Sequence, residues 1–455
     1  MEQTFSFRQR LKTFILVMLP VLVTNLAIMS VHLSDTMMTG HVNSVELAGV
    51  AVAANIYMPL FVTCMGIVSG LSPTIAHLYG GGDSAEIRRV VRQSFYWALL
   101  LGLFGSLLIY FGTPVLLDRL NLEQRVWEVA FGYSRVMMFC LPVSMAVVAL
   151  REFMNALGCT RITMLITSLT APLNIFFNYV FIFGAGPVEP LGGVGAACGT
   201  LAAFSAAALI HAAVARWMSP FDGYRIFDGM PKPQVHEWSK ALKIGFPIGL
   251  AMLSETSIFG AMGLCIATYG TLTAAASQSA FSVTSMLYAI PMSCSIALTI
   301  LVGFELGAGR PKDAVSYTNI GRVVSLGAAV ILIGAAWLAR YQVAAMFTGE
   351  GELLELIAGF VAYAALMNGA DSLNAPLQGA LRGYRDVKAV LILSIISFWV
   401  VGMPLGWVLA ELAGQGAYGY WQGVISGLFV GFILLAIRIN KVKKGQLCLK
   451  GKNPD

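Results

Sequence analysis

The stretch "RWMSPFDGYRIFDGMPKPQVHEWSK", residues 216–240, is the longest polar connection in the chain. It interrupts a series of apolar runs that begins near residue 14 and ends near residue 438, with six runs before it and six after it. Each run has about 20 residues or more, which is long enough to cross a bilayer as a helix. The sequence therefore predicts an all-α integral membrane protein with twelve transmembrane helices.

The position of this connection also predicts the domain organisation. We expect an N-terminal six-helix lobe over residues 1–220, a cytoplasmic linker over 221–240, and a C-terminal six-helix lobe over 241–455 that ends in a basic tail. The first apolar run is followed by Asp35 and lacks a small-residue cleavage site, so we interpret it as a retained helix rather than a signal peptide.

The composition supports a membrane protein. Of the 455 residues, 57% are hydrophobic and 11% are charged, whereas soluble globular proteins carry about 25% charged residues. The seven cysteines are scattered and contain no CxxC pair, so neither a disulfide framework nor a cysteine metal site is indicated.

The basic residues predict the orientation in the membrane. With the amino terminus placed in the cytoplasm, 25 of the 29 Lys and Arg residues fall in cytoplasmic segments. Basic residues concentrate on the cytoplasmic side of membrane proteins, so we expect a multi-pass protein of the cell membrane with both termini in the cytoplasm. This distribution also accounts for the net charge of +6 without a nucleic-acid partner. Only four basic residues fall outside, namely Arg119, Arg125, Arg135 and Arg340.

The two halves of the chain resemble each other. "SPTIAHLYGGGDSAEIRR" (72–89) corresponds to "TILVGFELGAGRPKDAVS" (299–316), and "MNALGCTRIT" (154–163) corresponds to "QGALRGYRDV" (378–387). The matching stretches lie about 222 to 228 residues apart, and both halves have six spans, so the repeat is parallel. Parallel repeats are typical of transporters that bind substrate between the repeats and expose it to alternate sides.

Few carboxylates lie deep within the apolar spans, and the candidates are Asp35, Glu255 and Asp371. A charge at the bilayer centre costs about 2.5–3.5 kcal/mol on insertion scales, and such residues usually face a cavity or bind a partner. The apolar spans around Glu255 and Asp371 contain no Lys or Arg that would neutralise them, so we predict that they bind an exchangeable H⁺ or Na⁺.

Structural roles remain open for the same carboxylates. Asp35 lies near the outer end of its span and could cap the helix or face water. Glu255 could make a buried side-chain hydrogen bond. The polar neighbours of Asp371 could satisfy it; these are Asn368, Ser372 and Asn374.

Two asparagines, Asn174 and Asn178, share one helix face because they are four residues apart. They could line a polar cavity opposite Asp35, or they could serve as hydrogen-bonding contacts between helices. No phosphate-binding loop, HExxH or GxSxG motif occurs, so we expect a protein that is not an enzyme and has no cofactor other than a coupling ion.

The chain resembles the multidrug and toxic compound extrusion (MATE) family, and in particular its NorM-like branch. The stretches that carry the resemblance are "DTMMTGHVNSVELAGVAVAANIYMP" (35–59), "LNIFFNYVFIFGAGPVEPLGGVGAACGT" (173–200), "FPIGLAMLSETSIF" (246–259) and "GALRGYRDVKAV" (379–390). The resemblance implies two six-helix lobes and export of cationic and amphipathic drugs in exchange for Na⁺ or H⁺ by alternating access.

The resemblance also implies roles for individual residues. Glu255 and Asp371 stand where the NorM-like branch has its cation site, which makes them possible Na⁺ ligands. Asp35, Asn174 and Asn178 stand at the polar positions of the first lobe. The chain departs from some sodium-coupled relatives at Met367, where they carry a tyrosine.

The leading interpretation is a secondary multidrug antiporter that works as a monomer in the lipid bilayer. Cation coupling is assigned to Glu255, Asp371 and Asp35, and the same residues together with the two asparagines are expected to line the substrate cavity. Two alternatives are a lipid-linked oligosaccharide flippase of the same superfamily, which would require a basic cavity, and an integral membrane enzyme. The five dispersed histidines provide no obvious catalytic constellation for the enzyme.

Overall fold

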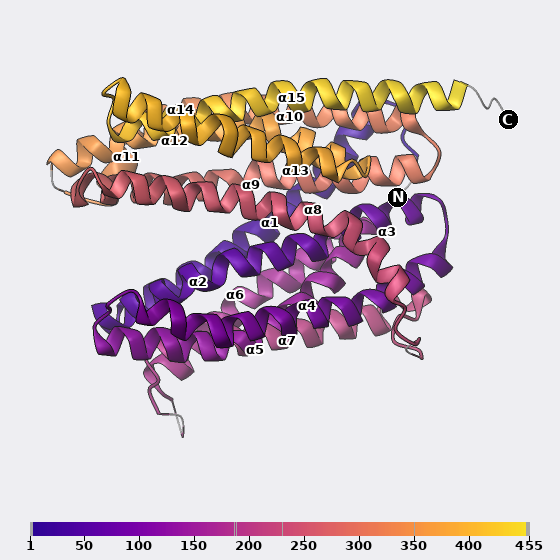
Figure 1. The fold of residues 1–455 in the computed structure, drawn as a ribbon. Coiled ribbons are helices and arrows are strands. Elements are labelled where there is room, and N and C mark those ends of the chain that lie inside the picture. The colour runs from indigo at the N-terminus through magenta and orange to yellow at the C-terminus, as the bar shows by residue number, and fades with distance from the viewer. Residues whose placement is uncertain (1–2, 186, 188, 230, 350, 452–455) are drawn as a thin grey trace. The chain divides into compact units, whose positions relative to one another are not determined.

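The computed structural model describes residues 3–185, 187, 189–229, 231–349 and 351–451, with side chains described up to residue 446. The chain folds into long helices joined by short connections (Figure 1). The helical elements of the first half are α1 (Phe7–Gly40), α2 (Ser44–Ser69), α3 (Leu71–Gly80), α4 (Ser84–Asp118), α5 (Gln124–Ala156), α6 (Thr160–Phe183), α7 (Gly193–Trp217) and the short η1 (Asp222–Tyr224). Those of the second half are α8 (Val235–Ala267), α9 (Thr271–Gly307), α10 (Pro311–Leu338), α11 (Arg340–Ala345), α12 (Gly351–Gly383), α13 (Val387–Ile395), η2 (Ile396–Gly402), α14 (Met403–Trp407), η3 (Val408–Leu412) and α15 (Ala417–Gly451).

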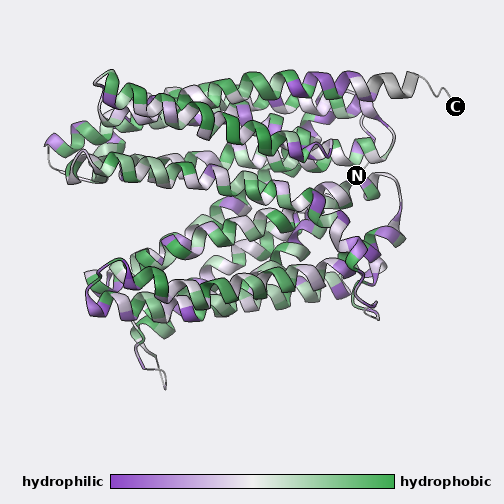
Figure 2. Ribbon diagram, in the orientation of Figure 1, coloured by the Kyte–Doolittle hydropathy of each residue, from purple (hydrophilic) through white to green (hydrophobic). Residues whose placement is uncertain are grey.

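The predicted fold class is confirmed. Twelve helical segments among the described residues are long and apolar enough to cross a membrane, and each corresponds to one predicted apolar run. They are 24 to 37 residues long, so most extend beyond the roughly 20 residues that the hydrocarbon core requires. Apolar residues follow the long helices (Figure 2), and large side chains such as Phe104 and Phe111 are mostly exposed, as expected for surfaces that contact lipid.

The packing divides the chain into two compact units. One unit comprises residues 23–249, and the other comprises residues 1–22 and 250–455. This grouping differs from a division into consecutive halves at residues 220 and 240. Nearly half of α1, residues 7–22, packs with the second half of the chain, and the first part of α8 packs with the first half.

Close backbone contact explains why the beginning of α8 belongs to the unit of residues 23–249. A Cβ atom added to Gly245 would lie 2.1 Å from the carbonyl oxygen of Ile67, and one added to Gly249 would lie 2.7 Å from the carbonyl oxygen of Thr63. A Cβ on Gly70 would in turn meet Gly245 at 2.5 Å. Small residues let membrane helices approach closely, and here they attach α8 to α2.

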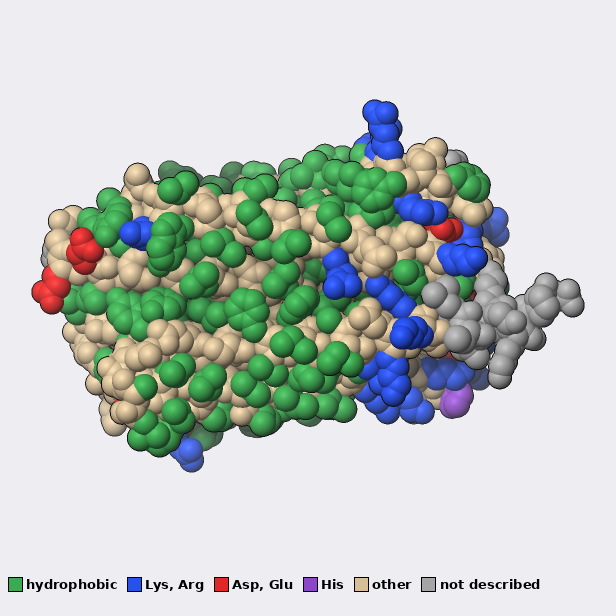
Figure 3. Space-filling view, turned by 90° about the horizontal axis from the view of Figure 1, so that it is seen from above, with side chains coloured by type: hydrophobic (Ala, Val, Ile, Leu, Met, Phe, Trp, Pro, Cys, Tyr) green, Lys and Arg blue, Asp and Glu red, His purple; other side chains and the backbone are tan. Residues whose placement is uncertain are grey.

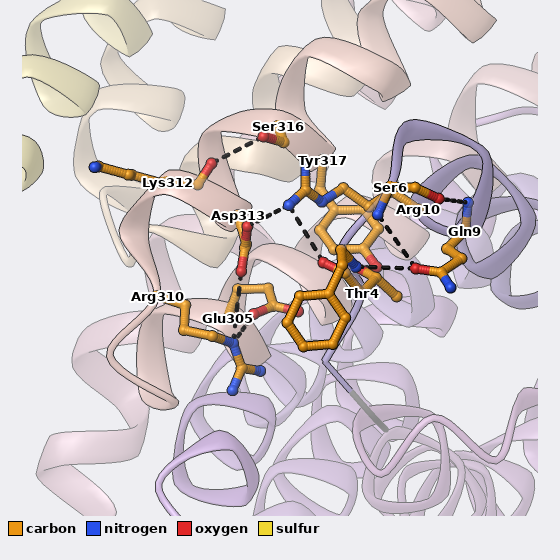
Figure 4. A network of polar contacts seen from close by, with 11 residues as sticks. Thr4, Ser6, Gln9, Arg10, Glu305, Arg310, Lys312, Asp313, Ser316 and Tyr317 are labelled. Carbon is orange, nitrogen blue, oxygen red and sulfur yellow. Dashed lines mark hydrogen bonds and ion pairs between the residues drawn. The ribbon is translucent and has the colours of Figure 1, made fainter.

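The beginning of α1 belongs to the other unit for two reasons. Phe14 and Val17 are buried in a core cluster whose other members come mainly from α9, α10, α12, α13 and α15. In addition, an Arg10 guanidinium nitrogen lies 2.6 Å from an Asp313 carboxylate oxygen and 3.2 Å from the carbonyl oxygen of Thr4 (Figure 4). The start of α1 is therefore fixed to the first turn of α10.

The connection over residues 216–240 packs against the N-terminal end of α4. Arg88 donates to the carbonyl oxygen of Tyr224, and Arg92 donates to the carbonyl oxygens of Arg225, Ile226 and Asp228. Gln93 accepts hydrogen bonds from the Gln234 N–H and the Trp238 indole, each at 2.9 Å. The polar connection that separates the two sets of spans is therefore fixed to α4 by these hydrogen bonds.

A row of glycines spaced by four residues packs α15 against the preceding segment, which contains two π-helical stretches around Pro404. A Cβ atom added to Gly419 would lie 2.3 Å from the backbone nitrogen of Ala410, and one added to Gly423 would lie 2.2 Å from the Cα of Gly406. One added to Gly427 would lie 2.3 Å from the carbonyl oxygen of Ser397. Proline lacks the N–H that would continue an α-helix, which agrees with the wider turns there.

Candidate functional site

Asp35 lies in α1 within the unit of residues 23–249 and is only 5% exposed. Its Oδ1 atom accepts hydrogen bonds from the Nδ2 atoms of Asn174, at 3.0 Å, and Asn178, at 2.6 Å. Its Oδ2 atom accepts one from the Thr200 hydroxyl at 2.9 Å. Three neutral donors on α6 and α7 therefore surround the carboxylate.

The polar network extends around the two asparagines. The Ser34 hydroxyl donates to Asn174 Oδ1 at 2.6 Å, and the Asn178 amide donates to the same oxygen at 3.2 Å. Helix α7 approaches so closely that a Cβ on Gly199 would lie 2.1 Å from Asn178 Oδ1. Glycine at this position therefore allows α6 and α7 to bring their donors to Asp35.

The other two predicted carboxylates come together in the other unit. Glu255, on α8, accepts a hydrogen bond from the Tyr288 hydroxyl on α9 at 2.9 Å. Asp371, on α12, is 5% exposed, and none of the described side chains hydrogen-bonds its carboxylate. The negative charges of Glu255 and Asp371 are close enough to repel each other. This pair is therefore acidic and has few hydrogen-bond donors.

The polar neighbours that could have satisfied Asp371 are engaged elsewhere. The Asn368 amide donates to the Ala364 carbonyl oxygen at 3.0 Å, and the Asn374 amide donates to the carbonyl oxygens of Ala370 and Leu428, each at 2.9 Å. The Ser372 hydroxyl is buried without a hydrogen-bond partner among the described atoms. None of the three neutralises Asp371.

A basic residue just beyond the predicted apolar run of Asp371 lies near Glu255. Arg382, one of the last residues of α12, interacts electrostatically with Glu255 and with Tyr288, and its Nε atom is buried without a hydrogen bond. Arg382 and Glu255 do not form a direct ion pair among the described contacts. The sequence placed Arg382 in a cytoplasmic segment, and it missed this contact because α12 continues as a helix to Gly383.

The sequence also missed the neutral partners. Thr200, Ser34 and Tyr288 were not identified, although Thr200 follows the small-residue stretch of α7 that allows close packing. Met367, where some relatives have a tyrosine, is fully buried in an apolar core cluster. Asp35 belongs to the compact unit of residues 23–249, whereas Glu255 and Asp371 belong to the other unit.

The second cluster, which consists of Glu255, Asp371 and Tyr288, has the chemistry of a cation site. Hard cations take oxygen ligands, and the cluster offers two carboxylates and a phenolic oxygen. Within the described residues, no group of three or more His, Cys, Asp or Glu side chains is arranged to hold a metal ion, so a multidentate site of that type is not formed there. A proton or a single monovalent cation would offset the repulsion between Glu255 and Asp371.

Comparison with known proteins places these features in a family. The MatE family model matches residues 20–180 and 247–408. Proteins from Bacillus subtilis (strain 168) and Geobacillus kaustophilus, both named "Probable multidrug resistance protein NorM", are 37% and 38% identical to this chain. The alignments cover 98% of this chain and 98% of the B. subtilis protein, and 93% of each chain for G. kaustophilus.

The fold matches solved structures as well. The eukaryotic MATE transporter AtDTX14 superimposes with a TM-score of 0.88 at 19% identity, over 97% of this chain and 98% of that one. The Vibrio cholerae MATE transporter VcmN in its bent form gives 0.86 at 18% identity, with the same coverage. Together with the family model and the NorM relatives, these matches show that the chain belongs to the multidrug and toxic compound extrusion (MatE) family, in its NorM-like branch.

Proposed function

We propose that this protein is a secondary multidrug efflux antiporter that exports cationic and amphipathic drugs in exchange for Na⁺ or H⁺. The relatives at 36–38% identity are named multidrug resistance proteins, and they align over nearly the whole chain. Both polar clusters within the spans are acidic, which favours cationic cargo over anionic cargo.

The observation that carries this proposal is the sparse pairing of Glu255 and Asp371. The two carboxylates lie near each other in membrane helices, and the pair receives one side-chain hydrogen bond, from Tyr288 to Glu255. A mobile cation can neutralise the negative charge that remains. Arg382 supplies partial compensation at Glu255 from the end of α12. An ion entering the site therefore meets one carboxylate with a fixed positive neighbour and one without a described hydrogen-bond donor.

Coupling requires that each ligand binds one conformation of the protein better than the other, because a ligand shifts an equilibrium only by its difference in affinity. In this proposal the cation favours the conformation in which Glu255 and Asp371 are close, and the drug favours the other one. Each charge that crosses 100 mV contributes about 2.3 kcal/mol, which corresponds to a concentration ratio of roughly fifty.

The first-lobe cluster has a different proposed role. Asp35 is already surrounded by donors from Asn174, Asn178 and Thr200, so we assign it to the wall of the drug cavity and to a proton-carrying role if H⁺ is the coupling ion. A flippase for lipid-linked oligosaccharides would instead need a basic cavity for its pyrophosphate, and both clusters are acidic.

We also propose that both termini lie in the cytoplasm and that the protein acts as a monomer in the cell membrane. The orientation rests on the concentration of 25 of 29 basic residues on one side. Labelling of single cysteines introduced into the connection over residues 216–240 would test it. Protection from a membrane-impermeant reagent in intact cells is the expected result, and labelling there would contradict the orientation.

The central experiment measures drug movement in proteoliposomes under an imposed Na⁺ gradient and, separately, an imposed pH gradient. Drug accumulation driven by one of the two gradients is expected, and the effective gradient identifies the coupling ion. If neither gradient drives drug movement while the purified protein binds drug, the antiport proposal is wrong. Transport driven by the Na⁺ gradient would assign the ion site to Glu255 and Asp371. Transport driven by the pH gradient would make Asp35 as strong a candidate for the proton-carrying residue as Glu255.

A further inference from the structure

Two basic residues near the predicted cytoplasmic ends of α10 and α15 lack a carboxylate partner. Lys443, on α15, is 8% exposed, and its ammonium group donates one hydrogen bond, to Asn319 Oδ1 at 3.0 Å. Arg322, on α10, lies one helical turn after Asn319 and is close enough to Lys443 for the two positive charges to repel. Among the described residues neither forms an ion pair with Asp or Glu.

Other arginines at the same end of this unit are paired. Arg10 lies 2.6 Å from Asp313, and Arg310 lies 2.6 Å from Glu305 (Figure 4). Arg438, less than two turns before Lys443 on α15, makes two hydrogen bonds to the Asp386 carboxylate, at 2.6 and 3.2 Å. The pairing of these neighbours shows that carboxylates are available in this region.

A buried ammonium has three N–H donors, and Lys443 uses one of them on a neutral oxygen. Burying a positive charge beside a second one is unfavourable unless an anion compensates. Within the described residues the protein does not supply that anion. A negatively charged ligand beside Arg322 and Lys443 would supply the missing compensation.

The surface around these cations has the form of a lipid-binding site. Val330, two turns after Arg322 on α10, is 64% exposed. On α10, Leu326 follows Arg322 by one turn toward the bilayer and is 51% exposed. Figure 3 shows apolar side chains over most of this face and Lys and Arg side chains gathered toward the end where α15 terminates.

We propose that Arg322 and Lys443 bind the phosphate of an anionic phospholipid in the cytoplasmic leaflet, with its acyl chains along the exposed apolar surface of α10. An arginine presents a planar fork that matches phosphate oxygens, and a lysine adds a compact positive charge. Basic pockets between transmembrane helices on the cytoplasmic side bind anionic headgroups in this way. The inference depends on the predicted orientation but not on the proposed drug transport.

The bound lipid would connect α10 to α15 and would bind the folded protein only. It should therefore raise the thermal stability of the protein, by an amount that grows with the logarithm of the lipid concentration above the dissociation constant. The exposed lysines Lys441 and Lys444 contribute general attraction to an anionic surface, which is weaker and does not depend on a defined geometry.

The test uses the purified full-length chain in detergent. The melting temperature is measured after addition of phosphatidylglycerol, phosphatidylcholine or inorganic phosphate, and retained lipid is counted by native mass spectrometry. The variant Arg322→Gln/Lys443→Gln is compared with Lys441→Gln/Lys444→Gln, which removes the same charge from exposed positions. Arg322→Gln alone is the second variant, because Arg322 has no described protein hydrogen bond whose loss would impair folding.

Phosphatidylglycerol is expected to raise the melting temperature of the wild type and of Lys441→Gln/Lys444→Gln by several degrees. The shift and the retained lipid should be lost in Arg322→Gln/Lys443→Gln and reduced in Arg322→Gln. Equal shifts in the two double variants, or an equal shift with phosphatidylcholine, would overturn the proposal. A shift with inorganic phosphate as large as with lipid would assign the site to a free anion and would also overturn it.

Discussion

The two acidic clusters differ in how completely the protein satisfies them. Asp35 accepts three hydrogen bonds from neutral side chains of α6 and α7, whereas Glu255 accepts one from Tyr288 and Asp371 accepts none from the described side chains. A carboxylate held by several donors has a fixed position and little need for a further ligand. A sparsely paired carboxylate gains most from a mobile cation, so the difference suggests positioning in one unit and exchange in the other.

The internal repeat does not relate the two clusters. Pro20 and Pro247 are 227 residues apart, and so are the positive-φ residues Gly82 and Gly309 that precede α4 and α10. At the same spacing, Asp35 corresponds to Met262, and Glu255 corresponds to Ile28. The repeat therefore preserves the helices and turns while the chemistry differs between the halves.

The largest effect is expected for Glu255→Gln, which tests whether the coupling cation binds at Glu255 and Asp371. The amide cannot carry the charge that a coupling cation neutralises, so ion-driven drug accumulation should fall from as much as roughly fiftyfold to about onefold. Gradient-driven transport in proteoliposomes measures this, with the exposed Glu352→Gln as the matched control. If Asp35→Asn abolished Na⁺-driven transport while Glu255→Gln preserved it, the assigned roles would be reversed.

A smaller effect is expected for Gly199→Ala, which tests how tightly the helices pack around Asp35. The new methyl group would lie 2.1 Å from Asn178 Oδ1, so α7 or Asn178 must move, at a cost of about 1–3 kcal/mol in the free energy of unfolding. Gly263→Ala in α8 is the control, because no atom lies within 4 Å of the added Cβ. Equal melting temperatures for the two variants would show that the packing around Asp35 is looser than described.

The third comparison removes one hydrogen bond from each cluster. Asn178→Ala should cost about 1–2 kcal/mol, because it takes a donor at 2.6 Å from the Asp35 carboxylate. Tyr288→Phe should cost about 0.5–1 kcal/mol and should change ion dependence more than stability, since the phenol contacts Glu255. Thermal unfolding at several Na⁺ concentrations distinguishes the two. A larger stability loss in Tyr288→Phe would reverse the comparison.

The smallest effect is expected on the surface of the first unit, at the Arg216–Asp228 ion pair of the connection. The hydrogen bond from Arg216 lowers the pKa of Asp228 below its ordinary value of 3.8. A lowered carboxyl pKa contributes stability that is present above pH 3.8 and is lost as the pH falls through the folded-state pKa. Because Asp228 is exposed, Asp228→Asn should leave stability at neutral pH nearly unchanged and slightly reduce its loss on acidification. A large change in acid unfolding would show that the pair matters more than its exposure implies.

Hydropathy and composition were sufficient to predict the fold class, since each of the twelve runs became a helix long enough to span the membrane. The repeat was predictable too, because its glycines and prolines recur at a fixed spacing. The grouping of the packing was not predictable: residues 7–22 of α1 and 235–249 of α8 each pack with the other half of the chain. Glycine contacts such as Gly245 with Ile67 decide this, and sequence alone does not say which helix will face a small residue.

The sequence by itself determined which side chains bear charge inside the membrane, because the cost of burying a carboxylate makes Asp35, Glu255 and Asp371 conspicuous in apolar runs. Only the tertiary structure decided which side chains become the partners of each carboxylate. Thr200 reaches Asp35, Tyr288 reaches Glu255 and Arg382 approaches Glu255 because helices distant in the sequence pack side by side. Hydrogen bonds act over about 3 Å, so the partners of a buried charge depend on packing that hydropathy does not encode.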